Sequence, residues 1–140
     1  MIPKIHHILS AAECEQIITI FEESKITQTY RDTQILPYKN DKILKDLYKN
    51  FNIEVLLKPD AMQIVKWPTE SKMDPHIDPN DKYAVVIYLN DNFEGGATII
   101  NNSMVKPRKG YGVLFKGGKL KHSVTKITKG VRYTVAIWYV

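Results

Sequence analysis

From Ala61 onward, the sequence is divided into short apolar or alternating runs by residues that favour turns. Glycine supplies most of the divisions, and the runs cover residues 62–67, 75–78, 83–89, 97–100, 104–106, 111–115, 122–125 and 132–139. Many short strands at such intervals are typical of an all-β sandwich or barrel. The spacing therefore predicts a mainly β core for this part of the chain.

The segment before residue 61 carries two helical patterns. Ser10 and Glu13 have the spacing of a capping box, and apolar residues follow at helical intervals at Cys14, Ile17, Ile18 and Phe21. Cys14 lies on that apolar face, which favours a core position over a nucleophile. A second helix is predicted over residues 41–51, and a short strand over residues 34–36 within the polar segment 27–40. We therefore expect one α+β domain over residues 1–140, with helical support in residues 1–60 and a β-rich core in residues 61–140.

The single cysteine, Cys14, excludes an intramolecular disulfide and favours a reducing compartment. The start, MIPKIHHILS, lacks the apolar run of a signal peptide, and no stretch reaches membrane-spanning length. We therefore expect a soluble, cytoplasmic protein without a membrane partner. The sequence leaves the oligomeric state undetermined.

The formal net charge of +5 conceals an asymmetry along the chain. Every acidic residue lies at or before Glu94, and the remainder carries only basic residues, at Lys106, Arg108, Lys109, Lys116, Lys119, Lys121, Lys126, Lys129 and Arg132. Such a pattern usually forms a solvated face, although it would also attract an anionic ligand, an acidic partner or nucleic acid. Because most of these charges are dispersed lysines, nucleic acid is the less favoured partner.

Three residues in the β-rich part have side chains suited to binding a metal. His76 and Asp78 are two positions apart, so in a strand their side chains project to the same side, and His122 begins a later run. Two histidines and one carboxylate on a single face are typical of non-haem Fe(II) oxygenases. A zinc hydrolase would also use such ligands. The adjacent His6 and His7 are a poorer pair, because neighbouring residues point in different directions.

Arg132 stands in the otherwise apolar run KGVRYTVAIWYV, ten residues after His122. A buried charge without a partner costs several kcal/mol, about 3–5 when the partner is removed. Because no acidic residue follows Glu94, a bound dicarboxylate would supply the missing partner through a bidentate contact. Thr134 lies two residues further on the same face and could donate a hydroxyl hydrogen bond to that carboxylate. The alternative is an arginine that reaches solvent or pairs with an upstream carboxylate.

These residues resemble the catalytic core of the prolyl 4-hydroxylase-like 2-oxoglutarate/Fe(II) oxygenases. The matching pieces are HID at 76–78, IYLNDNFEGGATII at 87–100, VKPRKGYGVLF at 105–115 and HSVTKITKGVRYTVAIWY at 122–139. The resemblance implies a double-stranded β-helix (jelly roll) with two N-terminal supporting helices.

The same resemblance implies roles for individual residues. His76, Asp78 and His122 would hold Fe(II), while Arg132 would bind the distal carboxylate of 2-oxoglutarate together with Tyr88 and Thr134. It also implies hydroxylation of a C–H bond with O2, release of succinate and CO2, and ascorbate as a reductant. A prolyl residue of a peptide or protein is the leading substrate. Two positions depart from the family: Arg132 replaces a common lysine, and Trp67 replaces a common tyrosine.

Two rival functions accompany this interpretation. A nucleic-acid demethylase of the same superfamily would fit the basic tail, but those enzymes carry a second arginine six residues after the first, where this chain has Trp138. A non-catalytic jelly-roll binding module would keep the fold with a degenerate site, which the complete set of candidate ligands disfavours.

Overall fold

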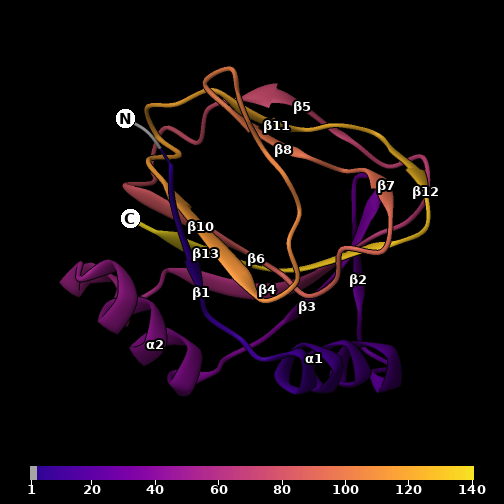
Figure 1. The fold of residues 1–140 in the computed structure, drawn as a ribbon, viewed down its shortest axis with the longest axis horizontal. Helices are drawn as coiled ribbons and strands as arrows, with labels where there is room; N and C mark the ends of the chain where they lie inside the picture. Colours follow the sequence, from indigo (N-terminus) through magenta and orange to yellow (C-terminus); the bar gives the residue numbers. More distant parts are fainter. Residues whose placement is uncertain (1–2) are drawn as a thin grey trace.

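The computed structural model describes residues 3–140, which fold into three antiparallel sheets and two α-helices (Figure 1). In chain order the elements are β1 (Lys4–His7), α1 (Ala11–Glu23), β2 (Gln28–Tyr30), β3 (Thr33–Pro37), α2 (Asp41–Phe51), a short 3-10 helix (Glu54–Leu57), β4 (Ala61–Trp67), β5 (Met73–His76), β6 (Tyr83–Tyr88), β7 (Glu94–Gly95), β8 (Thr98–Ile100), β9 (Ser103–Val105), β10 (Tyr111–Phe115), β11 (His122–Val124), β12 (Ile127–Lys129) and β13 (Arg132–Tyr139).

Two of the sheets face each other. The larger has seven strands in the order β1-β10-β6-β13-β4-β3-β2, and the smaller has four in the order β5-β11-β8-β9. A two-stranded pair of β12 and β7 lies toward one end, and both helices cover the outer face of the larger sheet (Figure 1). The prediction of a mainly β jelly roll with two supporting helices is confirmed.

The larger sheet has one face toward the helices and the other toward the smaller sheet. Successive side chains of a strand point to opposite faces, so each long strand divides its residues between the two sides. In β13 the residues that pack into the helix-side core are Val135, Ile137 and Tyr139. Those that line the interior between the sheets are Arg132, Thr134, Ala136 and Trp138.

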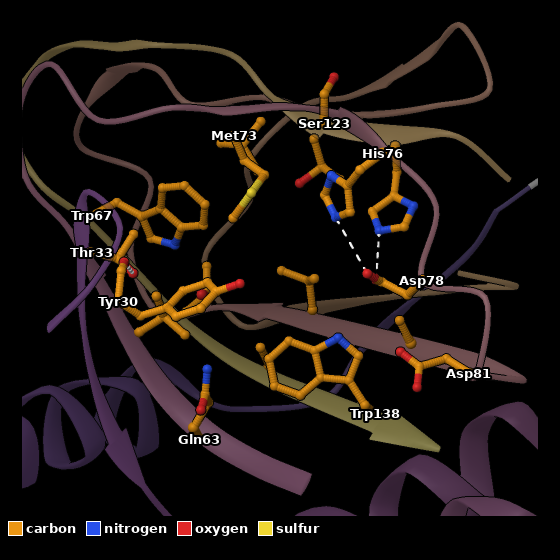
Figure 2. Close-up of a pocket in the computed structure, with 18 of the residues that line it drawn as sticks. Tyr30, Thr33, Gln63, Trp67, Met73, His76, Asp78, Asp81, Ser123 and Trp138 are labelled. Carbon is orange, nitrogen blue, oxygen red and sulfur yellow. Dashed lines mark hydrogen bonds and ion pairs between the residues drawn. The ribbon is translucent and has the colours of Figure 1, made fainter. Parts of the chain in front are cut away.

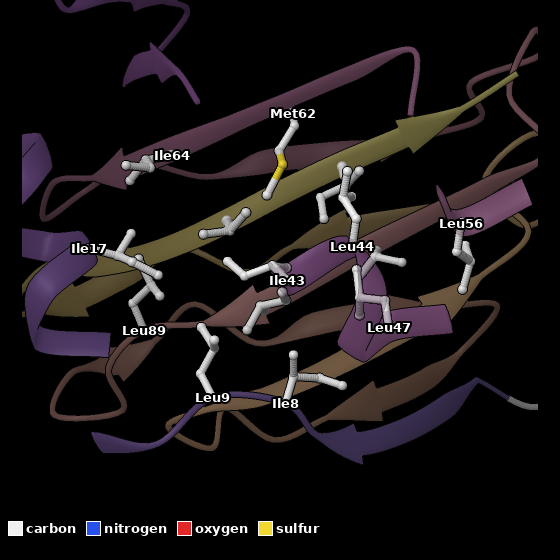
Figure 3. Close-up of a cluster of buried hydrophobic side chains, with 14 of the residues drawn as sticks. Ile8, Leu9, Ile17, Ile43, Leu44, Leu47, Leu56, Met62, Ile64 and Leu89 are labelled. Carbon is white, nitrogen blue, oxygen red and sulfur yellow. The ribbon is translucent and has the colours of Figure 1, made fainter. Parts of the chain in front are cut away.

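The helix-side core joins both helices to the sheet (Figure 3). In α1 its members are Cys14, Ile17 and Phe21, and in α2 they are Ile43, Leu44, Leu47 and Phe51. Full burial of each such side chain contributes about 1.5–3 kcal/mol relative to an exposed one. The helices are therefore held in place mainly by the apolar stripes that predicted them. No helix within residues 3–140 is long and apolar enough to cross a membrane.

The predicted capping box of α1 is confirmed. The backbone N–H of Glu13 donates to Ser10 Oγ at 3.1 Å, and the Ser10 N–H donates to Glu13 Oε1 at 3.0 Å. Cys14 is fully buried in the core, as expected, and burial raises the pKa of its thiol to about 11. The predicted second helix has the bounds Asp41–Phe51, and the predicted strand at 34–36 is part of β3.

The structure differs from the predicted elements in several respects, among them the two short strands β7 and β12, which were not predicted. Residues 3–60 contribute β1, β2 and β3 to the larger sheet, so this part of the chain is more than helical support. The strand predicted over residues 75–78 begins at Met73 and ends at His76, which leaves Asp78 in the following loop. Proline has no backbone N–H to donate to a neighbouring strand. Pro75 is tolerated inside β5 because β5 is an edge strand, which has a hydrogen-bonded neighbour on one side only.

Candidate active site

A cavity of about 730 Å³ lies between the facing sheets. The inner faces of β4 and β13 form one wall, while β5, β11 and the loop after β5 form another (Figure 2). The hairpin of β2 and β3 contributes Tyr30, Arg31, Thr33 and Ile35 to the lining. The cavity therefore includes residues from the part of the chain before residue 61.

The three predicted metal ligands converge on one wall of this cavity. His76 and His122 are directly opposite each other in the antiparallel pair of β5 and β11. Asp78 Oδ2 lies 3.1 Å from His122 Nε2, and Asp78 Oδ1 lies 3.6 Å from His76 Nε2 (Figure 2). One potential ligand atom from each residue falls within 4.8 Å of the other two. His122 is buried, whereas His76 and Asp78 are partly open to solvent.

The hydrogen bonds of the two imidazoles determine which nitrogens face the centre. His76 Nδ1 lies 2.8 Å from the carbonyl oxygen of Asp74, and His122 Nδ1 lies 2.8 Å from that of Leu120. A carbonyl oxygen only accepts, so in a neutral ring the proton is on Nδ1 and Nε2 carries a lone pair. Two such lone pairs then face a carboxylate, an arrangement that needs a cation or extra protons between them. Nδ1–H bonds to carbonyl groups are common behind metal-bound histidines, so the donor set fits a divalent metal.

Asp78 reaches this centre because its loop is held by the turn before β11. The backbone N–H of Asp78 donates to the Gly117 carbonyl at 3.0 Å, and the Asp81 N–H donates to the Asp78 carbonyl at 3.0 Å. Gly118 allows the close approach, because a Cβ there would lie 2.1 Å from the Asp81 carbonyl oxygen. The position of Asp78 thus depends on this loop contact rather than on the strand geometry used to predict it.

Arg132 is buried in the same cavity, with only 1% of its surface exposed. Nε donates to the Gly96 carbonyl at 3.0 Å, and Nη2 donates to Thr98 Oγ1 at 3.0 Å. Its guanidinium carbon lies 4.8 Å from the centre of the Trp67 ring and 5.2 Å from that of Tyr88. No ion pair among residues 3–140 includes Arg132, and burial lowers its pKa from the usual value. The structure therefore contains the unpaired buried cation that the sequence led us to expect.

The other two predicted cosubstrate residues lie beside Arg132. Tyr88 is buried with its hydroxyl 2.5 Å from Thr98 Oγ1, and Thr134 is directly opposite Tyr88 in the pairing of β13 with β6. Thr134 is also buried and lines the cavity. Tyr88, Thr98, Thr134 and Arg132 thus place several hydrogen-bond donors in one region of the interior.

Arg132 has contacts that sequence reasoning did not identify, with Thr98, Gly96 and Trp67. Thr98 and Arg132 are 34 residues apart, and their contact arises from the approach of separate strands. Gly96 has a positive φ of +67°, and a Cβ at this position would lie 3.1 Å from Arg132 Cδ and 2.8 Å from the Phe93 ring. The Gly95-Gly96 pair suggested only a tight turn from the sequence. No local pattern indicated that its carbonyl group would bind a guanidinium.

The charges along the cavity differ from those of the basic tail. Besides Asp78, the carboxylates of Asp60, Asp74 and Asp81 line it, whereas Arg31 and Arg132 are the only lysine or arginine side chains in its lining. The pKa of Asp81 is raised by burial and by the negative charges of Asp78 and Asp60. The basic residues of the tail other than Arg132 lie outside the lining, where most are exposed to solvent.

His6 and His7 lie in β1, away from this cavity. The His6 ring contacts Phe51 with centroids 4.9 Å apart, and the His7 ring stacks on Tyr111 at 4.9 Å. Neither belongs to the group of potential metal ligands formed by His76, Asp78 and His122. The structure therefore separates these two histidines from the candidate site.

A jelly roll with two histidines and a carboxylate on one cavity wall defines a class of protein, the non-haem iron oxygenases. Residues 62–140, more than half of the chain, match the 2OG-Fe(II) oxygenase superfamily. The chain belongs to this superfamily. The resemblance to prolyl hydroxylase-like members is also confirmed, because the similar proteins described next are prolyl hydroxylases.

Human prolyl 3-hydroxylase 2 is 35% identical over 92 residues, which cover 60% of this chain but 12% of that protein. Prolyl 3-hydroxylase 1 of Gallus gallus is 35% identical over 65 residues, which cover 41% of this chain and 9% of that protein. The chain therefore spans only a small part of the length of these curated relatives.

Two solved structures show the same fold over nearly the whole chain. Viral collagen prolyl hydroxylase vCPH from Paramecium Bursaria Chlorella virus-1, in its 2OG complex, has a TM-score of 0.74 at 18% identity and covers 97% of this chain and 93% of its own. A prolyl hydroxylase from Trichoplax adhaerens, in complex with a hypoxia inducible factor oxygen degradation domain peptide fragment, has a TM-score of 0.73 at 19% identity. That match covers 98% of this chain and 82% of the other.

Proposed function

We propose that this chain is a 2-oxoglutarate- and Fe(II)-dependent dioxygenase that hydroxylates a C–H bond of a peptide or protein. The observation that carries the proposal is the presence, in one cavity, of a three-residue metal-binding group and a buried arginine without a carboxylate partner. These are the two anchoring groups needed to hold a metal and a dicarboxylate near each other. A prolyl residue is the leading substrate, because the similar proteins are named prolyl hydroxylases.

His76, Asp78 and His122 would hold Fe(II) through the two Nε2 atoms and the carboxylate. The bound iron and 2-oxoglutarate supply the oxidative chemistry, in which one O2 oxygen enters the substrate C–H bond and the other enters succinate as CO2 is released. Arg132 would bind the distal carboxylate of 2-oxoglutarate, with hydroxyl hydrogen bonds from Tyr88 and Thr134. Thr98 and the Gly96 carbonyl hold the guanidinium in position before the ligand arrives.

The peptide would enter past the β2–β3 hairpin. Tyr30 and Arg31 of this hairpin line the cavity and are exposed, so they are available to contact a chain lying across its mouth. Asp60, Asp74 and Asp81 surround the same cavity, which disfavours a polyanionic nucleic acid as substrate. Trp138 also lines it, at the position where the demethylases carry their second arginine. We therefore retain the peptide substrate over the demethylase alternative.

Ascorbate as the reductant and a cytoplasmic location are further parts of the proposal. The location is supported by the single cysteine, which is buried and has no disulfide. A membrane partner and an oligomeric assembly are not part of it.

The proposed function can be tested by incubating the purified chain with proline-containing peptides, Fe(II), ascorbate, 2-oxoglutarate and air. Mass spectrometry should detect the gain of one oxygen atom on a peptide, with succinate formed in equal amount. Asp78→Ala should form neither product. The rival binding module predicts that the unaltered chain forms no succinate with any peptide. Metal analysis would support a zinc hydrolase if activity requires Zn(II) and continues without O2.

A further inference from the structure

A second cavity lies next to the candidate active site. It measures about 430 Å³ and lies at the end of the larger sheet, where α2 and the short 3-10 helix meet β4. Its volume is within the range of roughly 300–1,000 Å³ that is usual for ligand sites. The apolar residues of its lining are Tyr38, Leu44, Leu57, Pro59, Ala61 and Met62. Leu44 and Met62 also belong to the helix-side core, where they lie close together (Figure 3).

The lining of this cavity indicates what it could bind. Leu57, the last residue of the 3-10 helix, has 38% of its surface exposed and gives the cavity an apolar wall that a ligand could cover. The charged residues of the lining are two lysines and two aspartates, so their formal charges cancel; they are Lys39, Asp41, Lys58 and Asp60. The cavity therefore suits an uncharged apolar group more than an ion.

The second cavity adjoins the candidate active site. Asp60 and Ala61 line both cavities, so these two residues form the boundary between them. Both are exposed, so the boundary is open to solvent. The small side chain of Ala61 leaves room for a peptide to cross it. A peptide that occupies the main cavity could therefore continue into the second one.

The hydrogen bonds at the end of β13 give the length of this path. Strand β13 lies between β4 and β6. The Asp60 N–H donates to the Trp138 carbonyl at 2.8 Å, and the Lys82 N–H donates to the Tyr139 carbonyl at 2.7 Å on the other side of β13. Neighbouring strands are about 4.8 Å apart, so Asp60 and Lys82 are separated by about 10 Å. About three residues of an extended chain span that distance.

The start of this path is at the metal end of the main cavity. Asp81 precedes Lys82, and its backbone N–H donates to the carbonyl oxygen of Asp78 at 3.0 Å. Asp78 is one of the candidate metal ligands. Allowing for the steps into each cavity, a residue bound in the second cavity would be about four to six positions from the one beside the metal.

We propose that the second cavity is a specificity site for the peptide substrate, which binds an apolar side chain about four to six residues from the hydroxylated residue. The inference rests on the proposed function, because it assumes that the main cavity binds a peptide. It adds a sequence preference that the metal ligands and Arg132 do not supply. Leucine is the side chain used to test it.

Methionine methyl groups provide the test, because they lie in both cavities. Of the four methionines, Met62 lines the second cavity, Met73 lines the main one, and Met104 is exposed outside both. The sample would carry ¹³C-labelled methionine methyl groups, 2-oxoglutarate, and Zn(II) in place of Fe(II) to keep the site diamagnetic and prevent turnover. The probes would be glycine–alanine peptides with one central proline. One series has a leucine about four to six residues before or after the proline, and the matched series has alanine at that place.

Both series should shift the Met73 resonance, which substitution of each methionine by leucine would assign. Leucine at the correct distance should also shift Met62, while Met104 should stay unchanged. If leucine peptides shift Met73 and none shifts Met62, the second cavity takes no part and the proposal is overturned. If free N-acetyl-leucine amide binds at Met62 as tightly as the peptides do, the cavity is an independent small-molecule site, which also contradicts the proposal.

A charge placed in the apolar wall tests the contact itself. The unaltered chain should bind the best leucine peptide about tenfold more tightly than its alanine match, as measured by calorimetry. Leu57→Glu should lose this preference and bind the alanine peptide as before. Ile20→Glu is the matched control, because Ile20 is 46% exposed on α1 and lines neither cavity, so this variant should keep the preference. A full preference in Leu57→Glu would refute the contact. Thermal denaturation would verify folding, and the methyl titration of the unaltered chain decides if the variant is unfolded.

The same titration distinguishes this inference from the proposed function. If peptides shift Met73 without a preference for leucine, the specificity site is refuted and the peptide substrate stands. If no peptide in either series shifts Met73, the main cavity does not bind a proline-containing chain. The proposed substrate then fails, and the specificity site fails with it.

Discussion

Replacing Arg132 with methionine is the most direct test of the cosubstrate site. Methionine is apolar and has a comparable length, so it should fill much of the space between Trp67 and Tyr88 that the arginine stem and head now occupy. The change removes the buried cation that has no carboxylate partner in the described structure. It also leaves Thr98 hydrogen bonded to Tyr88. The variant should therefore fold and lose affinity for 2-oxoglutarate.

The size of the effect follows from the contact that is lost. A charged hydrogen-bonded contact contributes about 1.5–3 kcal/mol, so the dissociation constant should rise roughly tenfold to a hundredfold. At a ligand concentration of about one hundred times the original dissociation constant, 2-oxoglutarate should stabilise the unaltered chain by about 2.7 kcal/mol. The same concentration should stabilise Arg132→Met by only about 0.4–1.4 kcal/mol. For a domain of this size, 1 kcal/mol corresponds to a shift in Tm of roughly 3–4 °C.

Scanning calorimetry of the Zn(II)-loaded proteins, with and without 2-oxoglutarate, would measure the difference. The unaltered chain should gain about 9 °C in Tm and the variant about 1–5 °C. Arg108→Met is the matched control, because Arg108 is exposed, stacks on Tyr111 and lies outside the cavity. If 2-oxoglutarate raises the Tm of Arg132→Met as much as it raises the Tm of the control, Arg132 does not bind the carboxylate. Our reasoning about its missing partner would then be wrong.

The remaining predictions concern the metal centre and the stability of the fold. Asp78→Ala should abolish stoichiometric Zn(II) binding in a chelator competition while the circular dichroism spectrum is kept, and Asp81→Asn, a cavity carboxylate outside the metal-binding group, should still bind the metal. Gly118→Ala should weaken Zn(II) binding roughly tenfold, because a Cβ there would lie 2.1 Å from the Asp81 carbonyl oxygen and displace the Asp78 loop. The adjacent Gly117→Ala should have little effect, since its Cβ would approach no atom closer than 3.5 Å, and equal affinities in the two variants would contradict the loop argument. The pKa of Glu13 is lowered from 4.5 to about 2, first by the backbone hydrogen bond from Ser10 and then by Lys42, so its stabilising contribution is complete above about pH 4.5 and is lost as the pH falls toward 2. Urea unfolding should accordingly show that the stability gap between the unaltered chain and Glu13→Gln narrows over that range, and a constant gap would exclude the effect. Burial raises the pKa of the Cys14 thiol to about 11, so iodoacetamide at pH 8 should leave the folded chain unmodified and label it in denaturant, as read by mass spectrometry.

The parts of the fold with strong local patterns were predictable from the sequence. The α1 helix was marked by its capping box and apolar stripe, and the bounds of α2, β10 and β13 agree with the predicted runs. Strand β1, by contrast, has four exposed residues, Lys4–His7, and pairs with β10 at the edge of the larger sheet. An exposed edge strand lacks the alternation of buried and solvated side chains on which strand prediction depends. The three-residue strands β2 and β12 are similarly too short to show a pattern.

The candidate site was predictable where chemistry alone restricts the residue type. Scarce histidines beside a carboxylate, and an arginine in an apolar run, were sufficient to select His76, Asp78, His122 and Arg132 for one cavity. The reason given for Asp78 was nevertheless wrong in detail, because β5 ends before it and a loop contact with Gly117 positions it. Thr98 could not be selected, since its contact with Arg132 depends on the approach of strands that are distant in the sequence. Trp67 was noted only as a departure from the family's common tyrosine.

The two ends of the cavity belong to different sheets, and this division has a consequence for stability. His76 and His122 lie in the four-stranded sheet, whereas Arg132 and Trp67 lie in the seven-stranded sheet that also carries the helices. A dicarboxylate that binds the metal at one end and Arg132 at the other would connect the two sheets across the interior. Its binding energy would then oppose their separation, in addition to satisfying buried donors that otherwise destabilise the fold. Under the proposed function, the buried cation without a carboxylate partner would be a cost of the ligand-free chain that binding of the dicarboxylate would remove.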